Sequence, residues 1–213
     1  MFLFTKNNIK VALLFLGLFN AANAVELRTL VQFDFPADIT IEKKVRDVKE
    51  ERVWATDPVY IAGAEFIYAA EFSPIHYGFG FAFKSSQSNN SAQGTPATIP
   101  LWANFSFGAY NNQRPFWPYA IVRGGTLLPL TTNGNWWERP FNYFIEGGVG
   151  VIMSYSIGLE VNYNFSSMKK SYVDKKTNFR VSSGRFGIQL SLGFELSRDK
   201  TYKPNDKIDN SVQ

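Results

Sequence analysis

The sequence predicts an all-β protein that folds as an eight-stranded antiparallel up-and-down transmembrane β-barrel. Three observations predict it: apolar and polar residues alternate strictly in many stretches, these stretches recur along the chain, and an export signal precedes them. Successive side chains of a strand point to opposite sides, so strict alternation gives each strand two chemically different faces. Segments of about ten alternating residues are typical of strands that cross a membrane as a closed barrel.

The export signal occupies residues 1–24. Two lysines precede an apolar run over 11–19, and small residues end the segment at Ala24. These three parts predict a secretory signal peptide that is cleaved before Val25. The apolar run is short for a membrane span, which needs about 20 residues, so an uncleaved anchor is the weaker alternative. No later segment offers a spanning helix. A closed barrel needs none, because closure satisfies its backbone hydrogen-bonding groups within lipid.

Eight strand candidates follow in chain order: 26–36, 58–72, 76–85, 98–109, 116–127, 142–153, 156–166 and 181–197. The clearest is 156–166, where apolar residues from Ile157 to Phe165 take every second position and small or polar residues lie between them. The same alternation runs from Arg185 to Leu196. An even number of strands returns both chain ends to one side of the barrel.

Residue volumes indicate which face meets lipid. A soluble lipid-binding barrel keeps its apolar face inside, whereas an outer-membrane barrel turns that face outward. In 76–85 four aromatic side chains share one face, and the other face carries two glycines. The interior of an eight-stranded barrel is only just wide enough for side chains, so these aromatic residues would crowd it. We therefore expect the apolar face to meet lipid.

The connections between the strands alternate in length. The long ones cover 37–57, 86–97, 128–141 and 167–180, and the short ones cover 73–75, 110–115 and 154–155. Outer-membrane barrels have short periplasmic turns and longer extracellular loops. We therefore expect the long connections to face the cell exterior and both chain ends to lie in the periplasm.

Three segments carry a resemblance to a known family: Tyr143–Met153, Ile157–Phe165 and Gly187–Phe194. Together with the alternation, they resemble the small eight-stranded outer-membrane β-barrel proteins of the OmpA and OmpX type. The resemblance implies a place in the bacterial outer membrane, among its lipids and lipopolysaccharide, and delivery by the barrel assembly machinery. In that family the last strand carries the assembly signal, and the glycine and spaced leucines of 187–192 are similar to it.

The barrel is expected to cover residues 25–197 and to be followed by a tail, 198–213. Members of the family often end on an aromatic residue of the last strand, so the tail departs from their pattern. It is polar and contains Pro204, a composition that predicts disorder in the periplasm.

Charged residues gather on the predicted inner face. They are Arg28, Asp34, Glu65, Glu71, Lys84, Arg123, Glu146, Glu160, Arg185 and Glu195. Charges in a narrow, partly dry interior are costly unless hydrogen-bonded ion pairs satisfy them. Such pairs would form a polar plug that fills the barrel. The alternative is an ion-conducting or gated path, with Arg123 and Glu146 on adjacent strands as its gate.

A run of mixed charge in the first long connection is a candidate for surface contact. Residues 42–52 are interpreted as a solvated loop or strand extension, or more sharply as a contact with lipopolysaccharide phosphates or a host surface. The basic residues that would make this contact are Lys43, Lys44, Arg46, Lys49 and Arg52.

Two tryptophans in another long connection also allow two interpretations. Trp136 and Trp137 in the third long connection either anchor the barrel at headgroup depth or, beyond the membrane, form a binding hot spot for an extracellular partner. Four further aromatic residues are assigned to the girdles at the membrane surfaces: Trp54, Trp102, Trp117 and Tyr119.

Composition argues against several kinds of chemistry. The chain has no cysteine, which excludes a thiolate nucleophile or a disulfide. Its net charge of +4 comes without a basic stripe and argues against nucleic acid as a partner. His76, the only histidine, would need Ser73 and Glu71 as partners for hydrolysis, and all three fall at a predicted periplasmic turn. No catalytic residue, cofactor or metal site is therefore predicted.

These observations together predict a non-enzymatic integral outer-membrane barrel that acts in envelope integrity or in surface interaction through its extracellular loops. A narrow pore or small-solute channel is the alternative. A hydrolase that modifies outer-leaflet lipid is a weaker one.

Overall fold

The computed structural model describes residues 24–45, 48–69, 74–86, 95–108, 116–130, 142–153, 156–171 and 177–198. The predicted signal peptide and polar tail lie outside these residues, except for the boundary residues Ala24 and Arg198. Within the described ranges, no helix is long and apolar enough to cross a membrane.

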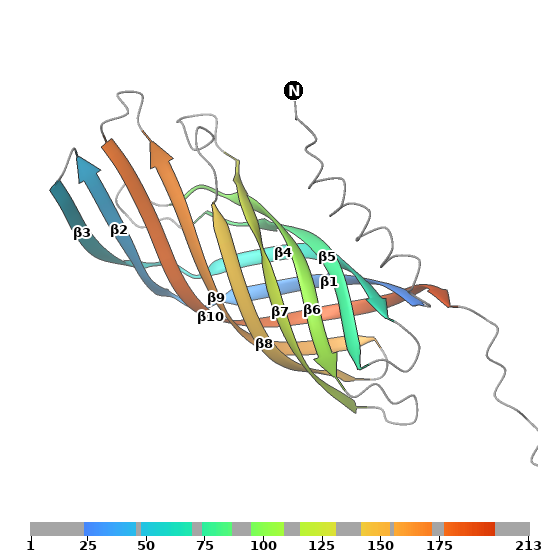
Figure 1. Cartoon of the computed structure of the whole chain (residues 1–213). Helices are drawn as coiled ribbons and strands as arrows, with labels where there is room; N and C mark the ends of the chain where they lie inside the picture. Colours follow the sequence, from blue (N-terminus) through green and yellow to red (C-terminus); the bar gives the residue numbers. More distant parts are fainter. Residues whose placement is uncertain are drawn as a thin grey trace, which may run out of the picture.

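Eight strands close into an antiparallel barrel (Figure 1). They are β1 (Ala24–Asp34), β4 (Val59–Ala69), β5 (Ile75–Lys84), β6 (Thr98–Gly108), β7 (Phe116–Pro129), β8 (Tyr143–Met153), β9 (Ile157–Ser171) and β10 (Thr177–Arg198). Each strand pairs with the next in this order, and β1 also pairs with β10, which closes the ring. The predicted closed eight-stranded antiparallel barrel is therefore confirmed, and each predicted strand matches one barrel strand.

Both described chain ends lie at one end of the barrel. Ala24 pairs with Ala69 on one side and with Arg198 on the other. The connections that follow β4, β6 and β8 leave at this same end, which we call the turn end. The connections that follow β1, β5, β7 and β9 leave at the opposite end, which we call the loop end.

The connection predicted as a loop at 37–57 is instead a hairpin. β2 (Ala37–Val45) and β3 (Val48–Thr56) pair with each other, and β2 pairs with Thr177–Ser183 of β10. β10 is 22 residues long, so its first part pairs with β2 and its second part with β1. Unpaired backbone groups need partners, and the hairpin supplies them where β10 extends beyond β1.

Strand pairing also replaces most of the loop predicted at 167–180, because β9 runs to Ser171 and β10 begins at Thr177. We call β2, β3 and the ends of β9 and β10 (167–171 and 177–182) the projecting sheet, which extends beyond the barrel in Figure 1. Its inner face buries a cluster of Ile39, Ile41 and Val181, against which Trp54 and Phe179 pack. The assignment of Trp54 to a girdle was therefore wrong.

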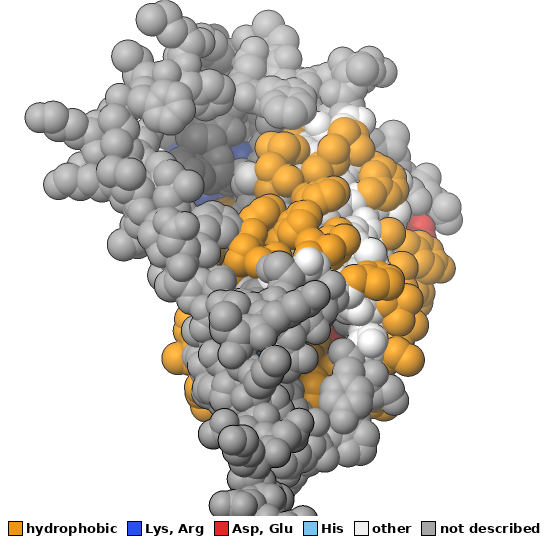
Figure 2. All heavy atoms as spheres, turned by 90° about the vertical axis from the view of Figure 1, so that its right-hand side faces the viewer, with side chains coloured by type: hydrophobic (Ala, Val, Ile, Leu, Met, Phe, Trp, Pro, Cys, Tyr) orange, Lys and Arg blue, Asp and Glu red, His pale blue; other side chains and the backbone are white. Residues whose placement is uncertain are grey.

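The two faces of the barrel differ in polarity as the alternation predicts. Figure 2 shows hydrophobic side chains gathered on the outer surface. Exposed apolar residues include Val31, Phe79, Phe81, Phe83, Leu101, Phe105, Val122, Ile145, Val149, Leu159, Val161, Phe186, Ile188 and Leu190. Buried polar residues include Gln32, Asp34, Glu65, Lys84, Asn104, Arg123, Glu146, Glu160, Asn162, Asn164, Arg185 and Gln189.

Three aromatic residues that were assigned to the girdles lie inside the barrel. Trp102, Trp117 and Tyr119 are at most 9% exposed, on the inner face of β6 and β7. Glycines on neighbouring strands make the room: a Cβ at Gly80 would meet the indole of Trp102, and one at Gly150 would meet the ring of Tyr119. The assignment failed because it treated the interior as uniformly narrow.

Candidate functional site

Arg123 is the centre of an ion-paired cluster inside the barrel. It lies midway along β7 and is 2% exposed. Its Nε lies 2.6 Å from Glu65 Oε1, and its Nη1 lies 2.8 Å from Glu146 Oε1 and 2.5 Å from Glu160 Oε1. The three carboxylates come from β4, β8 and β9, so one guanidinium joins four strands across the interior.

Each of these carboxylates also accepts a hydrogen bond from a neutral side chain. Trp102 Nε1 donates to Glu65 Oε1 at 2.7 Å. The Tyr119 hydroxyl donates to Glu160 Oε2 at 3.0 Å, and Gln32 Nε2 donates to Glu146 Oε2 at 3.0 Å. The interior aromatic residues therefore orient the acids, because a buried charge needs every available donor.

A second cluster surrounds Asp34, which is fully buried near the loop end of β1. Its carboxylate accepts hydrogen bonds from Gln32 Nε2 at 2.7 Å and from Asn164 Nδ2 at 2.8 Å. Lys84 Nζ lies 3.9 Å from Asp34 Oδ2. Because Gln32 also donates to Glu146, its amide links this cluster to that of Arg123.

Arg185 has a different environment from the other interior cations. It is fully buried on β10, and its Nη1 donates to the carbonyls of Phe35 at 3.2 Å and Asp57 at 3.0 Å. Its Nη2 donates to the hydroxyl of Thr56. These acceptors flank the β2–β3 hairpin on both sides, so Arg185 holds the base of the hairpin to the barrel wall.

The remaining predicted interior residues are placed as follows. Arg28 pairs with Glu26, whose Oε1 lies 3.0 Å from Arg28 Nη2. Glu26 was not predicted, although it continues the alternation of β1. Glu71 lies outside the described residues, and Glu195 is described only by its backbone, opposite Glu26 in β10.

The surface candidates divide between described and undescribed parts of the chain. Lys43, Lys44, Lys49 and Arg52 lie in the hairpin, whereas Arg46, Trp136 and Trp137 lie outside the described residues. Lys49 pairs with Glu42 at 3.2 Å and with Glu51 at 3.8 Å.

Two small cavities lie inside the barrel, and both are lined by Lys84 and Leu127. The larger also reaches Arg123 and Glu146 and has a volume of about 30 Å³, whereas the smaller has about 10 Å³. A water molecule needs roughly 10–15 Å³ by this measure, so the cavities have room for isolated waters only.

The described residues offer no cluster of three or more side chains that could hold a metal ion. His76 lies in β5, opposite Ala69 and Ser106, and is half-buried. Ser73 and Glu71, which a hydrolase would need beside it, lie outside the described residues.

The fold and interior define a small closed β-barrel with an apolar exterior and ion pairs inside. Neither a protein-family model nor a curated protein matches the chain. Its function is therefore inferred from the structure and the sequence pattern.

Proposed function

We propose that the protein is an integral outer-membrane barrel, similar in kind to the small OmpA- and OmpX-type barrels, with a non-enzymatic role in envelope integrity or surface interaction. One observation carries the proposal: the outside is apolar and the inside is charged. Val149 and Phe186 are 65% and 64% exposed, whereas Glu65 and Arg185 are fully buried. Soluble proteins rarely expose continuous apolar patches above a few hundred Å², so lipid is the solvent that suits this surface.

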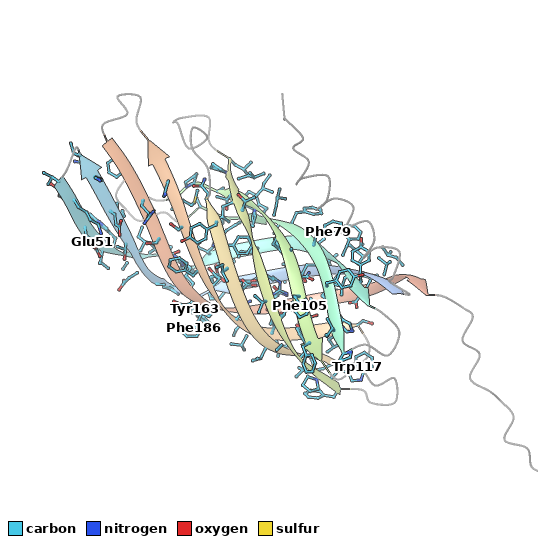
Figure 3. The ribbon with its side chains drawn as sticks, in the orientation of Figure 1. Glu51, Phe79, Phe105, Trp117, Tyr163 and Phe186 are labelled. Atoms are coloured by element: carbon cyan, nitrogen blue, oxygen red, sulfur yellow. The ribbon has the colours of Figure 1, made fainter. Side chains whose placement is uncertain are left out.

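Aromatic pairs at both ends of the outer face support this location. Near the loop end, Tyr163 packs edge-on against Phe186, with centroids 4.9 Å apart (Figure 3). Toward the turn end, Phe66 stacks on Phe79 at 5.1 Å, and Tyr68 packs against Tyr77 at 5.9 Å. Aromatic girdles of this kind flank the lipid-facing band of outer-membrane barrels.

The asymmetry of the two ends supports an orientation. The turn end carries the shorter connections and the described chain ends, Ala24 and Arg198, and the loop end carries the projecting sheet. Long extracellular elements and short periplasmic turns are usual in this class. The projecting sheet then faces the cell exterior, where it is available for surface interaction.

The packed interior favours a plugged barrel over a permanently open pore. Arg123 binds three carboxylates, and both the cavity beside this cluster and the smaller one beyond Lys84 have room only for isolated waters. A conducting state would require these ion pairs to separate. A narrow pore is therefore the alternative to the plugged barrel.

Location can be tested by expressing the full chain in a Gram-negative host and separating soluble, inner-membrane and outer-membrane fractions. The proposal predicts recovery in the outer membrane and a barrel that migrates differently on gels before and after boiling. A soluble periplasmic product without this heat-dependent shift contradicts it.

A further inference from the structure

The outward face of β9 and β10 changes from apolar to cationic in a fixed order toward the loop end. Paired outward residues on the two strands are, in turn, Leu159 and Leu190, Val161 and Ile188, Tyr163 and Phe186, Phe165 and Gly184, Ser167 and Ser182, and Lys169 and Arg180. The apolar rows therefore end at Phe165, a serine row follows, and a row of two cations comes next.

Lys169 and Arg180 are directly opposite each other and both exposed. Like charges in this arrangement destabilise a sheet. Neither cation makes an ion pair with a described residue. Glu42 lies opposite Arg180 on β2, but its carboxylate pairs with Lys49 instead, at 3.2 Å. Among the described residues, no carboxylate therefore lies within ion-pairing distance of either cation.

Lys44 adds a third cation on the same face. It pairs with Asn178, two residues from Arg180 along β10, and it is exposed. Such diagonal neighbours lie about 7–8 Å apart at Cα, within reach of long side chains. The three side chains can therefore converge on one anion.

The row lies at a height from which its long side chains can reach a lipid headgroup. Lys169 is four residues beyond Phe165 along β9, which is about 13 Å along the strand and about 10 Å along the barrel axis at the usual tilt. The headgroup layer begins where the apolar band ends and is about 5–8 Å thick on each side. Long cationic side chains at this height can reach back to it.

We propose that Lys169 and Arg180, assisted by Lys44, bind the phosphate of an anionic lipid in the membrane leaflet at the loop end. A guanidinium binds two phosphate oxygens at once, and an ammonium adds a compact charge. The phosphate relieves the repulsion between the paired cations. This inference rests on the proposed membrane location and names the lipid chemistry that the barrel recognises there.

Arg52 supplies a matched control. It is an exposed cation of the projecting sheet, but it lies opposite Ile41, which is buried on the inner face, so its side chain is not on the outward face that carries the row. Its loss removes one positive charge and leaves Glu42 paired with Lys49. A specific site and a general attraction to positive charge therefore give different results.

The test uses the full-length mature barrel, folded into phosphatidylcholine vesicles, extracted in mild detergent and analysed by native mass spectrometry with added diphosphorylated lipid A. Near a membrane surface each cation is worth about fivefold in affinity for an anionic lipid. K169Q and R180Q should each weaken binding about fivefold, the double variant about thirtyfold, and R52Q not at all. All variants should keep the heat-dependent gel shift.

Three results overturn the proposal. Wild-type lipid A affinity in the double variant shows that the site does not exist, and a loss in R52Q equal to that in K169Q shows nonspecific charge attraction. Displacement of lipid A by millimolar inorganic phosphate shows a site for free phosphate instead of lipid. If the variants keep the heat-dependent gel shift and insert into vesicles, each of these results contradicts only the lipid site and not the membrane location. A wild-type chain that does not insert into vesicles contradicts both proposals.

Discussion

Arg123 and Glu146 face each other directly on β7 and β8, and Arg123 Nη1 lies 2.8 Å from Glu146 Oε1. Two further carboxylates, from Glu65 and Glu160, bind the same guanidinium. The pair is thus part of a cluster in which one cation holds three acids, and the stability of the barrel should depend strongly on that cation.

Arg123→Ala should destabilise the barrel by about 3–5 kcal/mol, because it leaves three buried carboxylates without their cation. Urea unfolding in vesicles, followed by the heat-dependent gel shift, measures the free energy of unfolding. Arg52→Ala, which removes an exposed arginine of the hairpin, should change it by less than about 0.5 kcal/mol. Equal changes in the free energy of unfolding for the two substitutions would show that the ion-paired cluster does not stabilise the barrel.

The plugged interior predicts that the wild-type barrel carries no steady current in planar bilayers. Separation of the ion pairs should open a path beside the larger cavity, so Glu146→Ala should raise the frequency of conducting events. Lys49→Ala, far from the interior, is the control. A wild-type barrel that conducts steadily supports the pore instead.

Arg185→Gln should release the β2–β3 hairpin while the barrel stays closed, because Arg185 binds acceptors on both sides of the hairpin base. Trypsin should then cleave at the lysines and arginines of the hairpin at least several times faster, while the heat-dependent gel shift persists. Gln189→Leu is a control for a buried polar residue of the same strand. Unchanged cleavage in Arg185→Gln rules out the clamp.

Replacing a glycine should be costly where a side chain of the packed interior faces it. A Cβ at Gly80 would collide with the Trp102 indole, so Gly80→Ala should cost about 1–3 kcal/mol through overpacking. Gly124 is exposed on the outer face of β7, and a Cβ there would meet nothing within 4 Å, so Gly124→Ala should be neutral. Gly80→Ala combined with Trp102→Leu should recover part of the loss. If Gly124→Ala lowers the free energy of unfolding as much as Gly80→Ala does, collision with the Trp102 indole does not explain the loss of stability.

The barrel strands could be predicted because alternation is a local signal. The alternation within each strand identifies its two faces, and closure is expected because it leaves no strand edge unpaired. The pairing of β2 with β10 could not be predicted in this way. It depends on the length by which β10 extends beyond β1, which is not a local property of either strand. Ile39 and Ile41 do alternate with polar residues, but the charged run 42–52 that follows them led us to interpret the whole connection as a loop.

The interior shows the same division between local and non-local information. That Arg123 and Glu146 point inward follows from their positions in their strands. That Trp102 also lies inside depends on Gly80 of the neighbouring strand, and the registers of adjacent strands are not visible in the sequence. Glu26 was a missed local signal, since it continues the inward positions of β1.

The direct test of the central claim is the accessibility of single spin labels along β10 in lipid vesicles. The chain has no cysteine, so single-cysteine variants can be labelled at each position from 186 to 191. The account predicts high oxygen and low nickel-chelate accessibility at 186, 188 and 190, and low accessibility to both at 187, 189 and 191. High nickel-chelate accessibility at 186, 188 and 190 would place the apolar face in water and contradict it.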